Sequence, residues 1–278
     1  METFSATIRQ KHSRGNRCED IDSAIAKLQA RKVAEIDGYL LSPVSSIPSK
    51  AADLLQLGTR RSVDLAESAI REMNREALNS SCILTRAVLE TGCLMLYISH
   101  QVRHAVKDPA KADLDKLNTF MMDTLVGSGP KAKTFIFMEG HRVTNILTIM
   151  EKLDRELETP FLGFYEGLSE HSHPNAHGMA LTYANTHKAC VTTYTEQKES
   201  RTQVSLDMAI SALATSLQIA EMANRQWDED RQAFILLQER KIHEAGTWPK
   251  DTPYPLPRRS DGTFPTRIRN ASSETPLE

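Results

Sequence analysis

The stretch that decides the fold is Ile83–Ile98, which reads ILTRAVLETGCLMLYI. As a helix it would be apolar on almost every face, and a helix of that kind is normally enclosed at the centre of a domain. The run has only 16 residues and contains Arg86 and Glu90, so it is too short and too charged to predict a membrane span. We therefore expect a central helix from about Asn79 to Val106 in an all-α protein.

Amphipathic patterns on both sides of this stretch predict further helices. In the longest pattern, apolar residues recur every seventh position from Leu206 to Phe234, which is typical of a helix that packs one stripe against partners. Short connections favour antiparallel neighbours, so the patterns together predict an antiparallel helical bundle. Gly58 is interpreted as a helix cap, and a short strand or loop is expected at 182–195. The other expected helices span 21–41, 53–57, 59–77, 113–126, 143–157 and 161–172.

Changes in composition along the chain predict three segments. Residues 1–49 are interpreted as a polar N-terminal arm, loose up to about residue 20, followed by a helix and a linker. Residues 50–246 have the size and periodicity of one helical-bundle domain. Residues 247–278 hold half of the prolines and little periodic apolar content, so we expect a disordered C-terminal tail.

The overall composition is that of an ordinary soluble protein, with 40% hydrophobic and 25% charged residues. The formal charge of -2 argues against a nucleic-acid or membrane surface that depends on bulk charge. The polar N-terminus has no apolar core of a secretory signal. The four cysteines show neither metal-ligand nor disulfide spacing, which favours reduced thiols. We therefore expect a cytoplasmic protein without a membrane partner.

Groups that bind ligands or move protons are concentrated in Tyr165–Gly178, YEGLSEHSHPNAHG. Pro174 disfavours the helical conformation at His173, so the helix should end there, and Asn175 suits the turn that follows. Three interpretations of the stretch are open. One is a metal site, a second is acid–base chemistry at a histidine, and the third is capping of helix ends by polar side chains. The metal ligands would be His171, His173 and His177 with Glu166 or Glu170.

Arg86 and Glu90 are four residues apart and therefore share one face of the central helix. Buried charges persist only when they are paired and hydrogen-bonded. The two side chains therefore either pair with each other or with charges on a neighbouring helix, or they orient a functional site.

A longer pattern resembles that of a family of uncharacterised bacterial all-helical proteins. It consists of Asn145-Ile-Leu-Thr148 with Asp154, followed by Tyr165-x-x-Leu-Ser-Glu-x-x-His-Pro-Asn-x-x-Gly178. In that family an upstream helix carries an arginine and a glutamate, at the place of Arg86 and Glu90. The family is in turn distantly similar to the HEPN superfamily of helical bundles, which includes many RNA-cleaving toxins and defence proteins. The resemblance covers roughly residues 75–185. It implies a HEPN-like bundle, a homodimer, and no metal or other cofactor, since its motif requires only His173.

Two functions follow as hypotheses. The first is a metal-independent endoribonuclease-like defence or toxin protein acting on RNA. There His173 would be the acid–base group, Arg86 would stabilise the phosphorane, and the orienting and binding residues would be Glu90, Tyr165, Ser169, Glu170 and Asn175. HEPN proteins place an arginine four to six residues before the histidine, and this chain does not, so Arg86 would have to reach His173 from another helix.

The alternative is a non-catalytic helical module that binds a protein or a small ligand, with the Arg/Glu/His cluster as a structural lock. Breaking a fully buried pair would then cost about 3–5 kcal/mol. Burial separates the two hypotheses, because a lock is enclosed whereas a catalytic group faces a cleft.

Overall fold

The computed structural model describes residues 2–12, 16–127, 144–175, 178–179, 181–187, 191–194, 199–250 and 252–256. The fold is all-α, as predicted. Within those residues the regular structure is helical apart from one antiparallel hairpin, β1 (Ala184–His187) and β2 (Val191–Tyr194), in the region where a strand or loop is expected.

The chain divides into two compact units, which differ from the three segments expected from composition. Unit 1 consists of Met1–Lys32, Leu55–Ser99 and Thr144–Arg225. Unit 2 consists of Val33–Leu54, His100–Val143 and Gln226–Glu278. The boundaries fall within three long helices, so each unit contains a part of α4 (Ile47–Asn74), α5 (Leu78–Lys107) and α10 (Glu199–Glu244).

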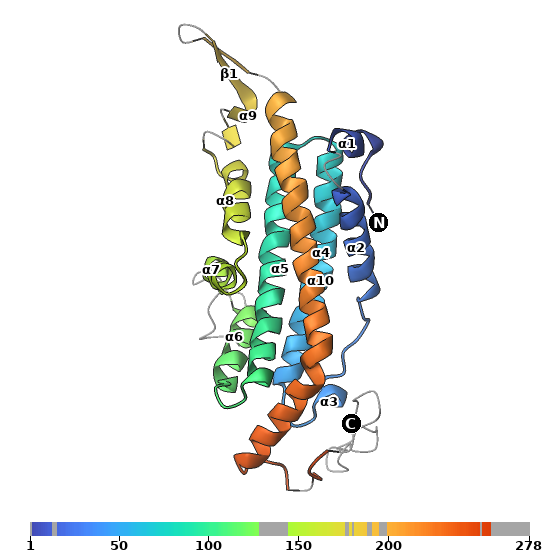
Figure 1. Cartoon of the computed structure of the whole chain (residues 1–278), viewed down its shortest axis with the longest axis vertical. Coiled ribbons are helices and arrows are strands. Elements are labelled where there is room, and N and C mark those ends of the chain that lie inside the picture. The colour runs from blue at the N-terminus through green and yellow to red at the C-terminus, as the bar shows by residue number, and fades with distance from the viewer. Residues whose placement is uncertain are drawn as a thin grey trace, which may run out of the picture. The chain divides into compact units, whose positions relative to one another are not determined.

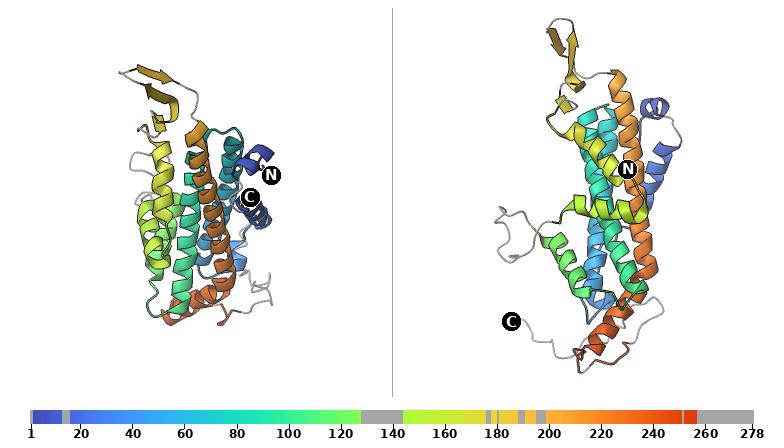
Figure 2. Two further views of the ribbon diagram at one scale, coloured as in Figure 1. Left: turned by 45° about the horizontal axis from the view of Figure 1, so that its top comes forward. Right: turned by 60° about the vertical axis from the view of Figure 1, so that its left-hand side comes forward.

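Unit 1 carries the hairpin and most of the helices (Figures 1 and 2). In addition to its parts of the long helices, it contains α1 (Ala6–Lys11), α2 (Arg17–Ala30), α7 (Ile146–Leu157), α8 (Phe161–Ser172) and α9 (Leu181–Tyr183). The bounds of α8 are those expected from the sequence.

The helix around Ile83–Ile98 is α5, and it is largely enclosed, as expected, since Val88, Leu89, Cys93 and Leu96 are fully buried. Ile83 near its start is 48% exposed. A close approach to α4 occurs at Gly58, where an added Cβ would lie 2.5 Å from Cγ of Met95. The prediction that Gly58 caps a helix was wrong, because α4 continues through it. The glycine makes room for a neighbouring side chain instead of ending the helix.

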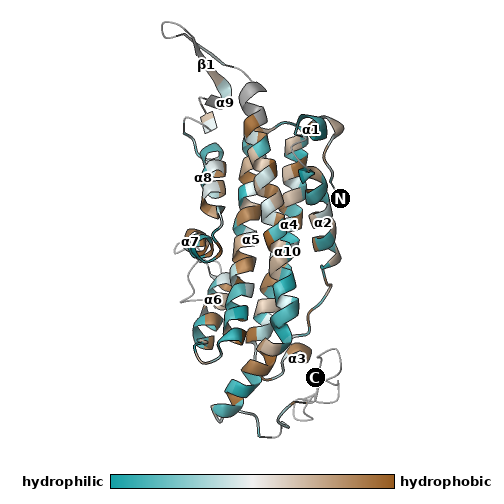
Figure 3. Ribbon diagram, viewed as in Figure 1, coloured by the Kyte–Doolittle hydropathy of each residue, from teal (hydrophilic) through white to brown (hydrophobic). Residues whose placement is uncertain are grey.

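The apolar stripe of α10 is confirmed, since Leu206, Ile210, Leu213 and Leu217 are all at most 1% exposed. Hydrophobic residues alternate with hydrophilic ones along this helix (Figure 3). Asn224 continues the stripe, and its Nδ2 donates a hydrogen bond to Oγ1 of Thr59 on α4 over 3.0 Å. A buried polar group is therefore satisfied inside the helical core.

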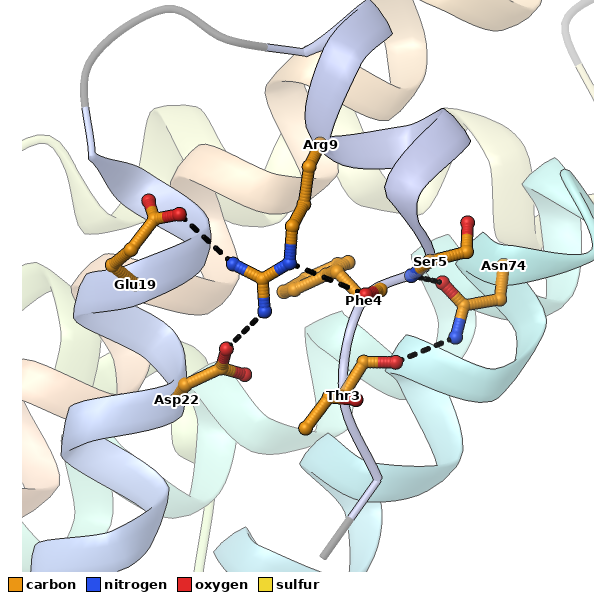
Figure 4. A network of polar contacts seen from close by, with 7 residues as sticks. All are labelled: Thr3, Phe4, Ser5, Arg9, Glu19, Asp22 and Asn74. Carbon is orange, nitrogen blue, oxygen red and sulfur yellow. Dashed lines mark hydrogen bonds and ion pairs between the residues drawn. The ribbon is translucent and has the colours of Figure 1, made fainter.

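The beginning of the chain is not the loose polar arm expected from the sequence. Phe4 and Ile8 are 4% and 1% exposed, so the segment is anchored by apolar burial. Arg9 on α1 bonds to Glu19 and Asp22 on α2 and to the carbonyl of Phe4 (Figure 4). Two apolar residues one turn apart are too short a pattern to reveal such a helix.

Among the described helices, α5 is long and apolar enough to cross a membrane by length and composition. However, 61% of its apolar window is buried inside the structure. The core helix of a soluble protein has the same properties.

Unit 2 contains α3 (Gly38–Leu41) and α6 (Leu114–Val126) besides its parts of the long helices. Nζ of Lys50 on α4 donates to Asn118 on α6 over 2.7 Å, and Nε of Arg103 on α5 donates to Asp230 on α10 over 2.6 Å. These contacts tie α4 to α6 and α5 to α10 within the unit.

The first part of the expected disordered tail is ordered in unit 2. Trp248 donates from its indole N–H to the carbonyl of Thr252, and the ring of Tyr254 stacks on His243 of α10 with centroids 3.9 Å apart. Leu256 is 5% exposed. The remainder of the expected tail, 257–278, lies outside the described residues.

Candidate functional site at the contact of α5 and α8

The start of α8 is capped by a side chain from α7. Oδ1 of Asp154 accepts a hydrogen bond from the backbone N–H of Phe161 over 2.9 Å, and Oδ2 accepts one from Leu162 over 3.0 Å. The first N–H groups of a helix have no partner within the helix, so a carboxylate there stabilises it. Thr159 also donates its hydroxyl to Asp154, at 3.1 Å. One carboxylate therefore fixes both the turn and the start of α8.

The end of α8 is at His173, as Pro174 predicts. His173 is the C-cap, with an extended backbone at φ -93° and ψ 148°, and its N–H donates to the carbonyl of Ser169 over 3.1 Å. The His173 side chain belongs to an exposed residue. The backbone of this residue thus has a structural role, whereas its imidazole is accessible.

Arg86 and Glu90 on α5 pair with each other, which is one of the arrangements expected from their spacing. Nε of Arg86 donates to Oε1 of Glu90 over 3.0 Å. The guanidinium carbon also lies 4.5 Å from the centre of the Tyr165 ring on α8, a cation–π contact between the two helices. The side chains of Arg86 and Glu90 are 24% and 29% exposed, so the pair is neither enclosed nor fully solvated.

Three contacts show that the chain passes from α7 to the segment after α8 in the direction opposite to that of α5, although α7 itself lies across α5 (Figures 1 and 2). Lys152 reaches the hydroxyl of Tyr97, Arg86 reaches Tyr165, and Asn79 reaches the carbonyl of Gly178. As residue numbers increase from Lys152 to Gly178, the contacted residues on α5 therefore decrease from Tyr97 to Asn79.

His173 is not brought to Arg86 by this arrangement. His173 is eight residues beyond Tyr165, which corresponds to about 12 Å along a helix axis. No contact joins Arg86 to His173 among the described residues. Of the three residues predicted to be catalytic, the structure brings together Arg86 and Glu90.

The residues predicted to bind are used mainly to hold the helix and the turn after it. Ser169 is 8% exposed, and its hydroxyl donates to the carbonyl of Tyr165 over 2.6 Å. Asn175 donates from Nδ2 to Glu170 over 2.8 Å and accepts at Oδ1 from the N–H of Gly178 over 2.9 Å. These bonds are those of the capping interpretation, which was the third of the three that the sequence left open.

The metal interpretation of the same stretch gains no geometric support. Within the described part of the chain, its histidines and glutamates form no group of three possible ligands. His177 lies outside the described residues.

The cysteines near the site are buried thiols. Burial raises the pKa of Cys82 to about 12. Burial also raises the pKa of Cys93, and the negative charges of Asp154 and Glu90 raise it further. The thiolate is the reactive form, so these two cysteines are not nucleophiles at neutral pH.

Sequence reasoning missed the role of Asp154. Its signal is an aspartate at the end of one amphipathic pattern, seven residues before the first residue of the next, with Pro160 just before the new helix. Such a signal identifies a capping candidate only once the turn is known to fold back.

Comparisons of the chain with protein-family models, with curated proteins and with solved structures found no match. The resemblance to HEPN-like proteins therefore stays a prediction.

Proposed function

We propose that the chain is a non-catalytic helical binding module in which Arg86, Glu90 and Tyr165 lock α8 onto α5. The observation that supports this best is how the polar side chains of α8 are used. Ser169 donates to the carbonyl of Tyr165, and Asn175 bonds to Glu170 and to the N–H of Gly178, so both side chains hold α8 and the turn after it in the shape that meets α5. A catalytic site would need these groups to converge on a position for the reacting atoms.

Unit 2 offers the surface through which such a module would bind. A groove of about 460 Å³ lies between the end of α5, the end of α10 and the segment after it. Sites for small molecules are mostly apolar and measure about 300–1,000 Å³. The walls are mainly apolar, with one acid and one base: Val106, Pro109, Ala233, Leu236, Leu237, Glu239, Arg240, Tyr254 and Pro255. This composition fits an apolar ligand with one polar group.

The lock is tested by Arg86→Ala. Because both charged side chains are about a quarter exposed, we expect a loss of about 1 kcal/mol in the free energy of unfolding, less than for a fully buried pair. Urea unfolding measures it. Arg75→Ala is the matched control, since Arg75 pairs with Glu72 on α4 but is 68% exposed. An Arg86 variant that loses no more than the Arg75 variant would contradict the lock.

The groove is tested with an apolar fluorescent dye, anilinonaphthalene sulfonate. Leu236 is 47% exposed in the groove, so Leu236→Arg should leave the fold intact and reduce dye binding about tenfold. Leu57, which is 56% exposed in unit 1, gives the control variant Leu57→Arg. Equal dye binding by both variants and the parent protein would show that the groove is not a binding surface.

The endoribonuclease remains the second candidate, and one observation favours it. The guanidinium of Arg86 uses Nε for Glu90, and within the described residues its two terminal NH₂ groups donate no hydrogen bond. These groups could bind a phosphate. Since His173 is about 12 Å from Tyr165 along the helix, this candidate takes Arg86 and His173 from two copies in a homodimer.

The two candidates are separated by an RNA cleavage assay in the presence of EDTA. The binding module predicts no cleavage by the parent protein. Cleavage that is lost in His173→Ala, with urea unfolding unchanged, would overturn the non-catalytic proposal and establish the ribonuclease.

A further inference from the structure

The last two turns of α5 present a histidine pair that neither function uses. His100 and His104 are four residues apart and therefore lie on the same face of the helix. Their rings are in edge-to-face contact, with centroids 4.7 Å apart and an interplanar angle of 89°. Both residues belong to unit 2, and His104 is exposed.

We propose that His100 and His104 form a binding site for a divalent transition-metal ion of the Zn²⁺ or Cu²⁺ type. Imidazole nitrogen is a preferred ligand of these ions. The ligand nitrogens of the two side chains lie within 4.8 Å of one another. A tetrahedral ion with Zn–N bonds of about 2.0–2.1 Å needs them about 3.3 Å apart. Small rotations of the two side chains close this difference, and water fills the remaining positions.

The position of the pair at the end of α5 favours a cation. His104 lies in the last turn of the helix, where the unpaired carbonyl groups carry partial negative charge. Arg103, on the same turn, is neutralised by Asp230 and Glu229 of α10. One nearby charge acts in the opposite direction. Lys107 follows His104 by three residues, and its positive charge repels the bound ion.

The site depends on a chelate, so losing either ring should leave only a single, weak ligand. Titration calorimetry with ZnCl₂, and separately with CuCl₂, should show one ion bound, with Cu²⁺ tighter than Zn²⁺. His100→Gln and His104→Gln should each weaken binding about tenfold or more. Lys107→Gln should tighten it, because a like charge is removed.

The matched control is His243→Gln, which replaces an exposed histidine on α10 in the same unit and should not change the affinity. Copper EPR spectra should show two coordinated nitrogens in the parent protein and in this control. Parent-level binding by both His100→Gln and His104→Gln would overturn the assignment. Absence of any bound ion in the parent protein would overturn it as well.

Discussion

The central helix α5 makes two very different contacts within unit 1. Towards α10 it presents Gly92, where an added Cβ would lie 2.8 Å from the carbonyl oxygen of Ser216 and 3.0 Å from Ile219. Towards α8 it presents Arg86, which reaches Tyr165 through a partly exposed cation–π contact. The first contact joins backbone and aliphatic groups, whereas the second joins a charged side chain to an aromatic ring.

The difference shows that the contact with the most polar and charged groups need not be the contact that tolerates substitution least. A backbone that lies against a glycine cannot yield without moving a helix, because protein interiors are close-packed. A long arginine at a partly solvated contact can adjust, and solvent screens its charges. The sites least tolerant of substitution should therefore lie on the side of α5 that faces α10, around Gly92.

The largest expected effect is that of Gly92→Ala. The new methyl group would meet the backbone of α10, so α5 and α10 would have to separate. We expect a loss of about 1–3 kcal/mol in the free energy of unfolding, which urea unfolding measures. A Gly92→Ala protein as stable as the parent would remove the basis of the comparison.

Two glycines serve as controls for this substitution. Gly163 on α8 has no heavy atom within 4 Å of the added Cβ, so Gly163→Ala should stabilise the protein by about 0.5–1 kcal/mol. At Gly58 the Cβ would meet only the flexible side chain of Met95, so the cost should be smaller than at Gly92.

The next effect concerns Cys82, which is enclosed on α5. Its pKa rises from an ordinary value of 9.0 to about 12 in the folded protein. Above pH 9 the unfolded chain therefore binds fewer protons than the native protein, and stability falls as the pH rises towards 12, by up to about 1.4 kcal/mol per pH unit. Cys82→Ala should reduce this fall, as measured by urea unfolding between pH 8 and 11. An unchanged pH dependence would show that the thiol is solvated.

The same contrast explains what the sequence could predict. The stripe of α10 and the limits of α8 rest on patterns local in the chain, seven-residue spacing and the prolines 160 and 174, and the structure has both. The prediction for Gly58 was wrong because a glycine that ends a helix and a glycine that makes room for a neighbouring helix look alike in the sequence. Only its partner Met95, on another helix, decides between them.

The candidate site was predictable in part for the same reason. Arg86 and Glu90 pair across one helical turn, a distance that sequence spacing determines. Whether His173 reaches Arg86 depends on the offset between α5 and α8, which spacing does not determine. The hydrogen bonds of Asp154 likewise depend on how α7 turns into α8.

Among the polar groups that position α8 on α5, Asp154 of α7 should have the largest effect. Asp154→Ala removes the acceptor for the N–H groups of Phe161 and Leu162, and loss of a helix cap costs about 1 kcal/mol. Asp154→Asn should retain part of this stability, because the amide oxygen still accepts a hydrogen bond. Equal losses for the two variants would show that charge, not the acceptor, is what matters there.

The smallest effect should be that of His173→Gln. The structural contribution of His173 is its backbone N–H, which bonds to the carbonyl of Ser169 and is kept by glutamine. Because the side chain belongs to an exposed residue, we expect a change within about 0.5 kcal/mol in urea unfolding. A loss comparable to that of Asp154→Ala would mean that the imidazole has a partner in the folded protein. His173 would then be part of the lock, and the contact of α5 with α8 would tolerate substitution as little as its contact with α10.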